Sequence, residues 1–282
     1  MSIKVHKIGF FGDGQWALNF LKKIKNHNNF EISFICCRKK VDKKIKFFAN
    51  KNKITFFAFK NINSNKNIKK ITSFKCDFLV SLSYDQIFKN KILNIFKNKI
   101  LNCHAGDLPK YRGRNVLNWV LINGEKSFSI TIHIIDKKID MGKLILKKKF
   151  IIKDSHTYKD LLNIANKECQ NVLLAGIKLF IKQKNKYKFK KISGKGEYYK
   201  KRKNGDEIID FSKKNIEIQN FIRALVPPGP YARLKLDDKI YKVKKSILIK
   251  QKKIGEKFYK INHIKQWIDF VKFDGKIRMY YI

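Results

Sequence analysis

The chain has 282 residues, of which 44% are hydrophobic and 13% aromatic. These values exclude an intrinsically disordered chain and leave enough apolar material for a core. No stretch approaches the roughly 18 uncharged apolar residues of a membrane span, and the first residues lack the pattern of a secretory signal. We therefore expect a cytoplasmic protein with no membrane partner.

The net charge is strongly positive, with 65 basic and 22 acidic residues giving a formal +43. Such a balance is typical of proteins that bind nucleic acids or anionic surfaces. However, 58 of the basic residues are lysines, scattered from Lys4 to Lys276, and Ile, Asn and Phe are also abundant. A/T-rich codons encode all of these amino acids. Codon bias thus explains the charge, and we expect no specific nucleic-acid partner, although an anionic partner stays open as the alternative.

The cysteines show no disulfide or zinc-binding pattern. Two are adjacent and the others are isolated, and no CxxC motif occurs: Cys36, Cys37, Cys76, Cys103 and Cys169. We expect buried thiols.

The N-terminal half alternates predicted strands and helices. Strands are expected at residues 7–11, 30–36, 54–59, 78–84 and 100–104, with helices at 17–24 and from an N-cap at Asp85 to about Phe96. Residues 60–70, rich in Lys and Asn, are interpreted as a loop. This alternation predicts an α/β fold with a mostly parallel sheet and helices on both faces, which binds ligands at the carboxyl ends of its strands.

The C-terminal half changes in character. A helix at 115–121 and strands at 128–136 and 143–152 precede a helix capped by Ser155 that extends to about Gln183. A basic link at 184–204 leads to a helix at 215–225, a Pro-rich turn at 227–230 and short β-rich segments. We predict a Rossmann-like catalytic domain over residues 1–195 and a small β-rich domain over 196–282.

The turn at residues 12–17 has the relaxed dinucleotide pattern G-x-G-x-x-G/A, starting at Gly12. The acidic residue expected at the end of the second strand is absent, because Cys36, Cys37 and Arg38 occupy that place. This disfavours NAD and leaves only an NADP interpretation through Arg38. The pattern is a weak indication, because any strand-to-helix turn of this type favours glycine.

Asn102 and His104 lie two residues apart at the end of a predicted strand, so their side chains share one face and Cys103 points to the other. An amide, an imidazole and a carboxylate from a later loop, Asp140, form a set that stabilises an oxyanion and moves protons. His104 taken alone is more often a structural residue. His133 alternates within an apolar strand and is interpreted as core.

Three motifs together resemble the 10-formyltetrahydrofolate-dependent formyltransferase family: Asn-x-His…Leu-Pro-x-Tyr-Arg-Gly at 102–113, Thr-x-His at 131–133 and Ile-Asp-x-Gly at 139–142. The resemblance is dense over residues 75–150 and looser over 221–230. It implies transfer of a formyl group from 10-formyltetrahydrofolate to a primary amine, with no metal. It also implies that Asn102, His104 and Asp140 are catalytic and that the folate lies near Leu82, Ser83, Tyr84 and Gly142.

The amine is indicated by departures from the methionyl-tRNA formyltransferases. Gly106 and Asp107 replace their usual Ser-Leu, whereas the runs at 111–119 and 123–125 resemble sugar N-formyltransferases. This resemblance implies a nucleotide-linked amino sugar, dTDP-linked above all, a role in O-antigen or lipopolysaccharide biosynthesis, and a homodimer. Two alternatives stay open: a methionyl-tRNA formyltransferase, and a non-catalytic basic RNA-binding protein.

Three residues are candidates for binding the sugar nucleotide. The planar fork of Arg114 suits a diphosphate, although a surface ion pair is an equal alternative. Gly12 and Arg223 complete the predicted substrate-binding set. Arg223 and the nearby Pro-Gly-Pro turn are also candidates for joining the two domains.

Overall fold

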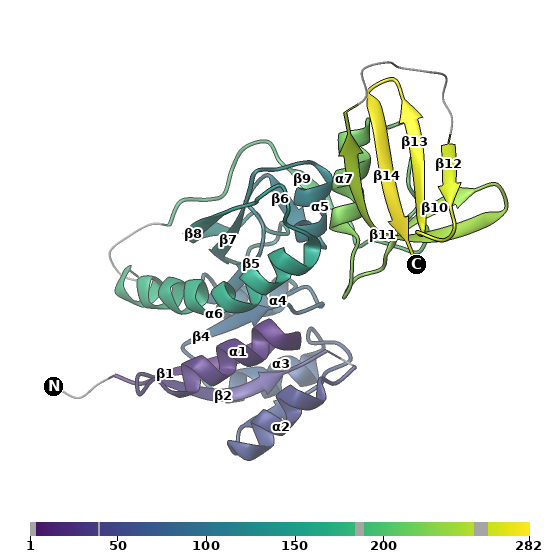
Figure 1. The fold of residues 1–282 in the computed structure, drawn as a ribbon. Coiled ribbons are helices and arrows are strands. Elements are labelled where there is room, and N and C mark those ends of the chain that lie inside the picture. Colours follow the sequence, from purple (N-terminus) through teal and green to yellow (C-terminus); the bar gives the residue numbers. More distant parts are fainter. Residues whose placement is uncertain (1–3, 39, 184–188, 251–258) are drawn as a thin grey trace. The chain divides into compact units, whose positions relative to one another are not determined.

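The computed structural model describes residues 4–38, 40–183, 189–250 and 259–282. The chain forms two compact units. The first comprises residues 1–112, 129–149 and 164–197, and the second comprises residues 113–128, 150–163 and 198–282. Figure 1 labels the helices and strands of both.

A seven-stranded sheet organises the first unit, in the order β3-β2-β1-β4-β5-β7-β8. Neighbours from β3 to β5 are parallel, and β7 is antiparallel to β5. The sheet therefore confirms the predicted α/β class with a mostly parallel arrangement. The strands are β1 (His6–Gly12), β2 (Phe30–Cys36), β3 (Thr55–Phe57), β4 (Phe78–Leu82), β5 (Ile100–His104), β7 (Ser127–Ile134) and β8 (Lys143–Ile151).

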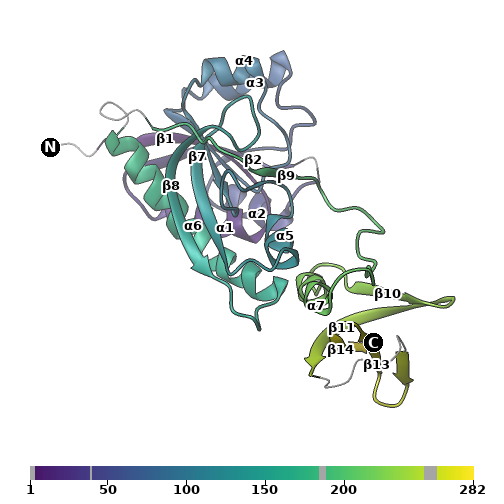
Figure 2. The same cartoon turned by 90° about the horizontal axis from the view of Figure 1, so that it is seen from above.

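Helices cover both faces of this sheet because its central strands β1 and β4 are nearly continuous buried runs whose side chains point to both faces. Phe10 on β1 stacks on Phe20 of α1 (Gly14–Lys25), with ring centroids 5.6 Å apart. The next residue, Phe11, points the other way and meets Phe88 at 5.1 Å. It shares a core cluster with α3 (Asn65–Ser73) and α4 (Asn90–Ile95), which lie together on one side of the strands in Figure 2. The long helix α6 (Tyr158–Gln183) contributes Phe180, which packs on Phe78 of β4.

One predicted loop is wrong, because residues 60–70 contain the start of helix α3. The hydroxyl oxygen of Ser64 accepts the N–H of Asn67 at 3.3 Å and caps the helix. Ile68 and Ile71 are buried on its inner face. The Lys- and Asn-rich composition concealed this short apolar repeat. Helix α2 (Lys43–Lys51), capped by the carboxylate of Asp42, was not predicted at all.

Both predicted N-caps are also wrong. Helix α4 begins at Asn90 after the N-cap Lys89, and Asp85 lies in the loop before it, whose buried Phe88 joins the core instead. Helix α6 begins at Tyr158 rather than after Ser155. There the carboxylate of Asp160 accepts the backbone N–H of Thr157 at 2.8 Å and its hydroxyl at 2.7 Å. Burial and local hydrogen bonds, rather than the first polar residue, determine where these helices begin.

The predicted link at 184–204 is bonded to the first unit over much of its described length; residues 184–188 lie outside the described residues. The N–H of Ile192 donates to the carbonyl of Gly142 at 2.7 Å, and that of Glu197 donates to the carbonyl of Lys110 at 3.2 Å. Strand β9 (Glu197–Tyr199) pairs with β6 (Tyr111–Gly113). Two loops of the sheet are thus tied to this segment.

The second unit is built on a five-stranded antiparallel sheet in the order β10-β11-β14-β13-β12. Its strands are β10 (Ala232–Leu236), β11 (Lys239–Ile249), β12 (Tyr259–Asn262), β13 (Trp267–Lys272) and β14 (Gly275–Tyr281). Helix α7 (Asn215–Ala224) packs Ile218 and Ile222 against Val243 and Met279 of the sheet. The predicted β-rich C-terminal part is confirmed. Helix α5 (Val116–Ile122) belongs to this unit as well.

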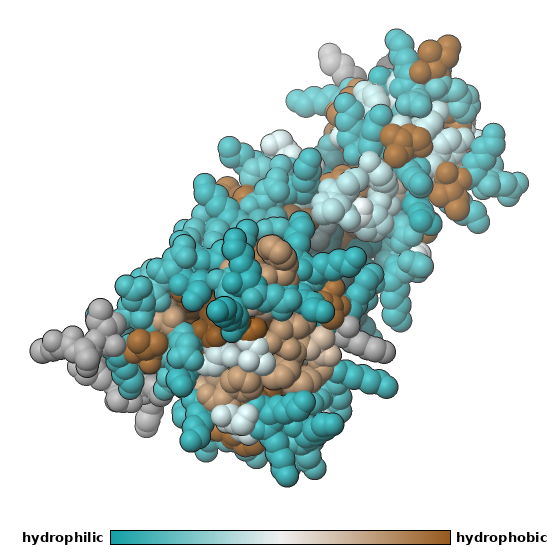
Figure 3. Space-filling model, turned by 90° about the horizontal axis from the view of Figure 1, so that it is seen from below, coloured by the Kyte–Doolittle hydropathy of each residue, from teal (hydrophilic) through white to brown (hydrophobic). Residues whose placement is uncertain are grey.

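The surface agrees with the lysine-rich composition. Figure 3 shows mostly hydrophilic side chains on the face that it presents, with one larger hydrophobic area in the lower part of the view and separate hydrophobic residues elsewhere. Across the described ranges, no helix is long and apolar enough to cross a membrane. All five cysteines are free and buried, which confirms that prediction.

Candidate active site

A cluster of four polar side chains, Asn102, His104, His133 and Asp140, lies where β5 pairs with β7. The antiparallel register places Asn102 opposite His133 and His104 opposite Thr131. Residues directly opposite in such a pair project from the same face of the sheet. Asp140, in the connection between β7 and β8, reaches the same cluster, with its carboxylate within 4 Å of both imidazoles. The structure thus brings together the three predicted catalytic residues.

His104 is oriented by the backbone of the following loop. Its side chain is buried, and its Nε2 lies 2.7 Å from the carbonyl oxygen of Tyr111. A carbonyl oxygen only accepts, so Nε2 carries a proton and donates it to this bond. In the neutral ring Nδ1 is then unprotonated, and it faces Asp140 Oδ2 at 3.9 Å. Nδ1 is therefore the nitrogen that is able to exchange a proton in the site.

Asp140 is held in place by a constrained turn. Its own backbone is left-handed, with φ of 54°, which is uncommon for a residue other than glycine. Two residues later, a Cβ on Gly142 would collide with the carbonyl oxygen of Ile134, so no larger residue fits there without a shift. The side chain of Asp140 is about one-tenth exposed. A carboxylate is consequently fixed between two imidazoles.

The sequence analysis missed the contribution of His133. The residue is buried, as expected for the core, yet its Nε2 lies 3.1 Å from Asn102 Nδ2 and 3.5 Å from Asp140 Oδ1. The available signal was the spacing of Thr131 and His133, two residues apart on a strand. Only the antiparallel pairing with β5 places that face beside Asn102, and the sequence alone did not give this pairing.

The loop after His104 is packed against the imidazole. A Cβ on Gly106 would collide with Nε2 of His104 and with the carbonyl oxygen of Tyr111. The hydroxyl of Thr131 donates to the carbonyl of Gly106 at 2.7 Å. Lys147 of β8 forms an ion pair with Asp107 at 2.6 Å in the same loop. The position requires glycine because His104 and the backbone of Tyr111 approach Cα of Gly106 too closely for a side chain.

The predicted folate residues lie at the neighbouring strand end. Leu82 of β4 pairs in register with Cys103 of β5, so residues 82–84 sit at the same sheet edge as Asn102. Ser83 has φ of 60° and accepts a hydrogen bond from Arg38 Nη2 at its carbonyl oxygen, at 2.6 Å. Tyr84 points into the core instead, where burial raises the pKa of its hydroxyl. The folate-binding roles of Leu82, Ser83, Tyr84 and Gly142 stay predictions.

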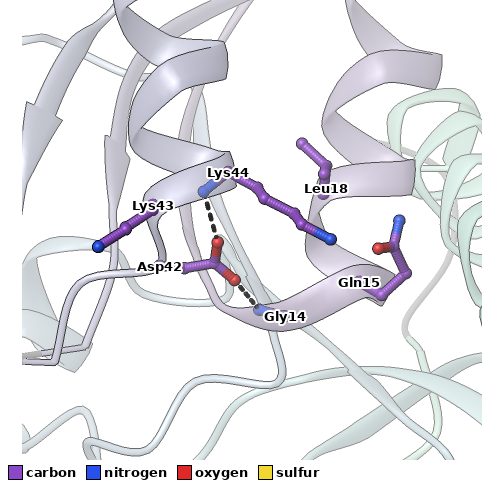
Figure 4. A pocket seen from close by; sticks show the side chains of 6 residues that line it. All are labelled: Gly14, Gln15, Leu18, Asp42, Lys43 and Lys44. Carbon is purple, nitrogen blue, oxygen red and sulfur yellow. Dashed lines mark hydrogen bonds between the residues drawn. The ribbon is translucent and has the colours of Figure 1, made fainter.

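The glycines of the turn at residues 12–14 pack against and bond with other parts of the protein. A Cβ on Gly12 would come within 2.5 Å of the carbonyl oxygen of Leu82, so close packing of β1 against β4 requires this glycine. The N–H of Gly14 donates to Asp42 Oδ2 at 3.1 Å, which engages an amide that a pyrophosphate would use. Figure 4 shows the adjoining cavity of about 480 Å³, lined by Gly14, Gln15, Leu18, Asp42, Lys43 and Lys44. The carboxylate of Asp42 disfavours a dinucleotide there.

The two candidate arginines lie in the second unit. Arg114 is exposed, and its N–H donates to the carbonyl of Tyr199 at 2.8 Å. Arg223 Nη1 donates to the carbonyls of three residues before α6, at 3.1 to 3.3 Å: Lys153, Asp154 and His156. Burial lowers the pKa of Arg223. Substrate binding by Gly12, Arg114 and Arg223 stays a prediction.

The arrangement supports acyl chemistry at a carbonyl. Asn102 offers N–H donors, His104 a nitrogen that exchanges a proton, and Asp140 a carboxylate beside it. In the part of the chain that the structure describes, no group of three or more His, Cys, Asp or Glu residues could hold a metal ion.

Curated relatives include two kinds of enzyme. The chain is 33% identical over 261 residues to the bifunctional polymyxin resistance protein ArnA of Wigglesworthia glossinidia brevipalpis, covering 90% of this chain but only 38% of that protein. It is 30% identical over 267 residues to the methionyl-tRNA formyltransferase of Finegoldia magna, covering 87% of this chain and 81% of the relative.

Solved structures resemble the whole chain. WlaRD, a sugar 3N-formyl transferase crystallised with dTDP and 5-N-formyl-THF, superimposes with a TM-score of 0.75 at 26% identity, covering 100% of this chain and 99% of the other. The N-formyltransferase of Helicobacter canadensis, in complex with folinic acid and dTDP-3-aminofucose, gives 0.75 at 25% identity, covering 99% and 100%.

Family models match both parts of the sequence. The formyl transferase model matches residues 6–177, and the model of the formyl transferase C-terminal domain matches residues 201–277. The first match includes Asn102, His104, His133 and Asp140, the cluster described above. The chain belongs to the formyl transferase family and is a formyltransferase.

Proposed function

We propose that this enzyme transfers a formyl group from 10-formyltetrahydrofolate to the primary amine of a nucleotide-linked amino sugar, with a dTDP-linked sugar favoured. One observation carries the choice of acceptor. Two sugar N-formyltransferase structures with dTDP or a dTDP-amino sugar match this chain over nearly its full length and theirs. The same two proteins were solved with formylated folates, which supports the donor.

The residues of the cluster fit such a donor. Bound 10-formyltetrahydrofolate would supply an amide-like formyl group whose oxygen gains negative charge as the amine attacks. Asn102 would donate an N–H to that oxygen, and protonated His104 would donate from Nδ1. One such donor in a dry site contributes roughly 3 to 4 kcal/mol to lowering the barrier.

The proton then has a defined route. A C–N bond forms between the acceptor amine and the formyl carbon, the bond to N10 of the folate breaks, and the amine loses a proton that N10 gains. Asp140, 3.9 Å from His104 Nδ1, would hold the imidazole charged and take the amine proton. Asn102, His104 and Asp140 thus have distinct roles.

Further parts of the proposal rest on resemblance. Leu82, Ser83, Tyr84 and Gly142 would line the folate site, and Arg114 would bind the diphosphate, with Gly12 and Arg223 as additional candidates. A homodimer in the cytoplasm, acting in O-antigen or lipopolysaccharide biosynthesis, completes the proposal.

A methionyl-tRNA formyltransferase is the second candidate, favoured by the 30% identity to the Finegoldia magna enzyme. Ligand binding separates the two. A nucleotide present at 100 times its Kd should add about 2.7 kcal/mol to the free energy of unfolding. We expect dTDP and folinic acid each to raise the melting temperature. Folinic acid should bind with either function, so dTDP decides: if dTDP has no effect while methionyl-tRNA raises the melting temperature, the sugar proposal is wrong.

A further inference from the structure

His133 has a hydrogen-bonding pattern that fixes its tautomer. Its side chain is 2% exposed, and its Nδ1 lies 3.1 Å from the carbonyl oxygen of Ile134. Because a carbonyl oxygen only accepts, Nδ1 carries the proton. The neutral ring has a single N–H, so its Nε2 is an acceptor. The atom 3.1 Å from Nε2 is then the amide nitrogen of Asn102, which donates.

This bond determines which way the Asn102 carboxamide faces. The terminal torsion of an asparagine is soft and roughly two-fold, so the amide oxygen and nitrogen exchange places at low cost unless a partner distinguishes them. Rotation by a half turn would set Asn102 Oδ1 against the lone pair of His133 Nε2, which is repulsive. The same rotation would present an oxygen where the reaction requires a donor.

We propose that His133 is a positioning residue for formyl transfer, which keeps the N–H side of Asn102 available to the formyl oxygen. The inference rests on the proposed function, because only a developing negative charge makes the amide orientation important. Nδ2 has two hydrogens, so one is shared with His133 while the other serves the substrate. His133 acts through Asn102 and does not itself touch the reacting atoms.

The second neighbour of His133, the carboxylate of Asp140, competes with Asn102 for Nε2. Asp140 Oδ1 lies 3.5 Å from Nε2, farther than Asn102 Nδ2. A proton on Nε2 would turn that nitrogen into a donor toward Asp140 and break its bond with the Asn102 N–H. The carboxylate would then pair with His133 at the expense of His104. The shorter contact, with the N–H of Asn102, is kept when the proton of His133 lies on Nδ1.

Variants test the role. In His133→Leu the acceptor is lost, and we expect kcat to fall about a hundredfold while KM for both substrates changes by less than about threefold. His133→Gln restores an acceptor oxygen and should recover at least about tenfold of that loss. Ile132→Val, a buried change on the opposite face of β7, serves as a control for packing, since it leaves the bond between His133 and Asn102 intact.

A double-mutant cycle separates positioning from a general structural role. If His133 acts through Asn102, adding His133→Leu to Asn102→Ala should reduce kcat by less than about threefold further. A full hundredfold further loss would overturn the proposal, and so would a His133→Leu enzyme within threefold of the wild type.

A measurement on the resting enzyme needs no turnover. ¹⁵N NMR of the labelled wild-type protein should show a neutral His133 protonated on Nδ1, and a proton on Nε2 would overturn the inference even if His133→Leu fails to fold. Should the wild type transfer no formyl group to any amine, the proposed function fails and the positioning role with it. The NMR result would then still report the tautomer.

Discussion

The imidazole of His104 and the carbonyl of Tyr111 are joined by a 2.7 Å hydrogen bond from Nε2. Because a carbonyl oxygen only accepts, this bond places the proton of the buried imidazole on Nε2. It leaves Nδ1 to face Asp140. The backbone of Tyr111, seven residues farther along the chain, therefore determines which nitrogen of His104 carries the proton.

Replacement of that histidine should abolish most of the activity. We expect His104→Asn to fold normally and to reduce kcat by on the order of a hundredfold or more, because the charged donor to the formyl oxygen is lost. His27→Asn, at a site away from the cluster, is the matched control and should keep full activity. Steady-state kinetics with circular dichroism decide the matter. Near wild-type turnover by a folded His104→Asn enzyme contradicts the assignment.

Gly106 should tolerate no side chain. In Gly106→Ala the new methyl group collides with His104, so we expect kcat to fall at least tenfold and the protein to lose about 1 to 3 kcal/mol of stability. In Gly229→Ala the new Cβ would lie 3.3 Å from the carbonyl oxygen of Val226, a much looser approach than at Gly106, so this variant serves as the control. Thermal melts and kinetics measure both effects. Unchanged activity in Gly106→Ala would show that the ring is not held as described.

The second unit should weaken in acid through Asp269. Burial pushes the pKa of this carboxyl upward, but the hydrogen bonds from Arg278 and Lys276 outweigh burial and lower it below 3.8. Its ion pairs therefore add stability above about pH 4, and this stability is lost as pH falls through the lowered pKa. We expect the wild type to lose more stability between about pH 5 and pH 3 than Asp269→Asn. The exposed Asp238→Asn should follow the wild type. Parallel curves for the wild type and Asp269→Asn would refute this account.

A variant of Arg223 tests whether this residue stabilises the fold or binds the substrate. Its guanidinium donates to three backbone carbonyls, so Arg223→Met should reduce the free energy of unfolding by about 1 to 3 kcal/mol. If Arg223 has a structural role alone, KM for the sugar nucleotide should change by less than twofold. A tenfold rise in KM with an unchanged melting temperature would instead support the predicted substrate-binding role.

The sequence predicted those parts of the fold that depend on local pattern. Strands β2 and β5 were predicted with their observed bounds, because apolar residues recur along each short segment and loop-forming residues flank it. Asp85 failed as a cap because residues 85–89, with the buried Phe88, form a loop and α4 begins only at Asn90. Ser155 failed because α6 begins at Tyr158, where the carboxylate of Asp160 accepts the N–H and hydroxyl of Thr157.

The sequence predicted the site residues that are close in sequence or part of a family motif. Asn102 and His104 share a face because they are two residues apart, and family resemblance added Asp140. His133 escaped because its partnership depends on the antiparallel register between β5 and β7, which joins residues 31 positions apart. Gly142 was predicted to line the folate site. In the structure a side chain there would collide with the carbonyl oxygen of Ile134, so packing beside Asp140 also requires glycine.

The central claim concerns the amine that receives the formyl group, and a side-by-side assay tests it most directly. The wild type is given 10-formyltetrahydrofolate with a panel of nucleotide-linked amino sugars in one series and methionyl-tRNA in the other, at physiological salt. Contacts between scattered lysines and RNA phosphates weaken by orders of magnitude from about 50 to 200 mM salt, whereas a pocket that engages two phosphates should not. We predict efficient formylation of a dTDP-linked amino sugar and none of methionyl-tRNA. Efficient formylation of methionyl-tRNA with no turnover of any amino sugar would contradict the account.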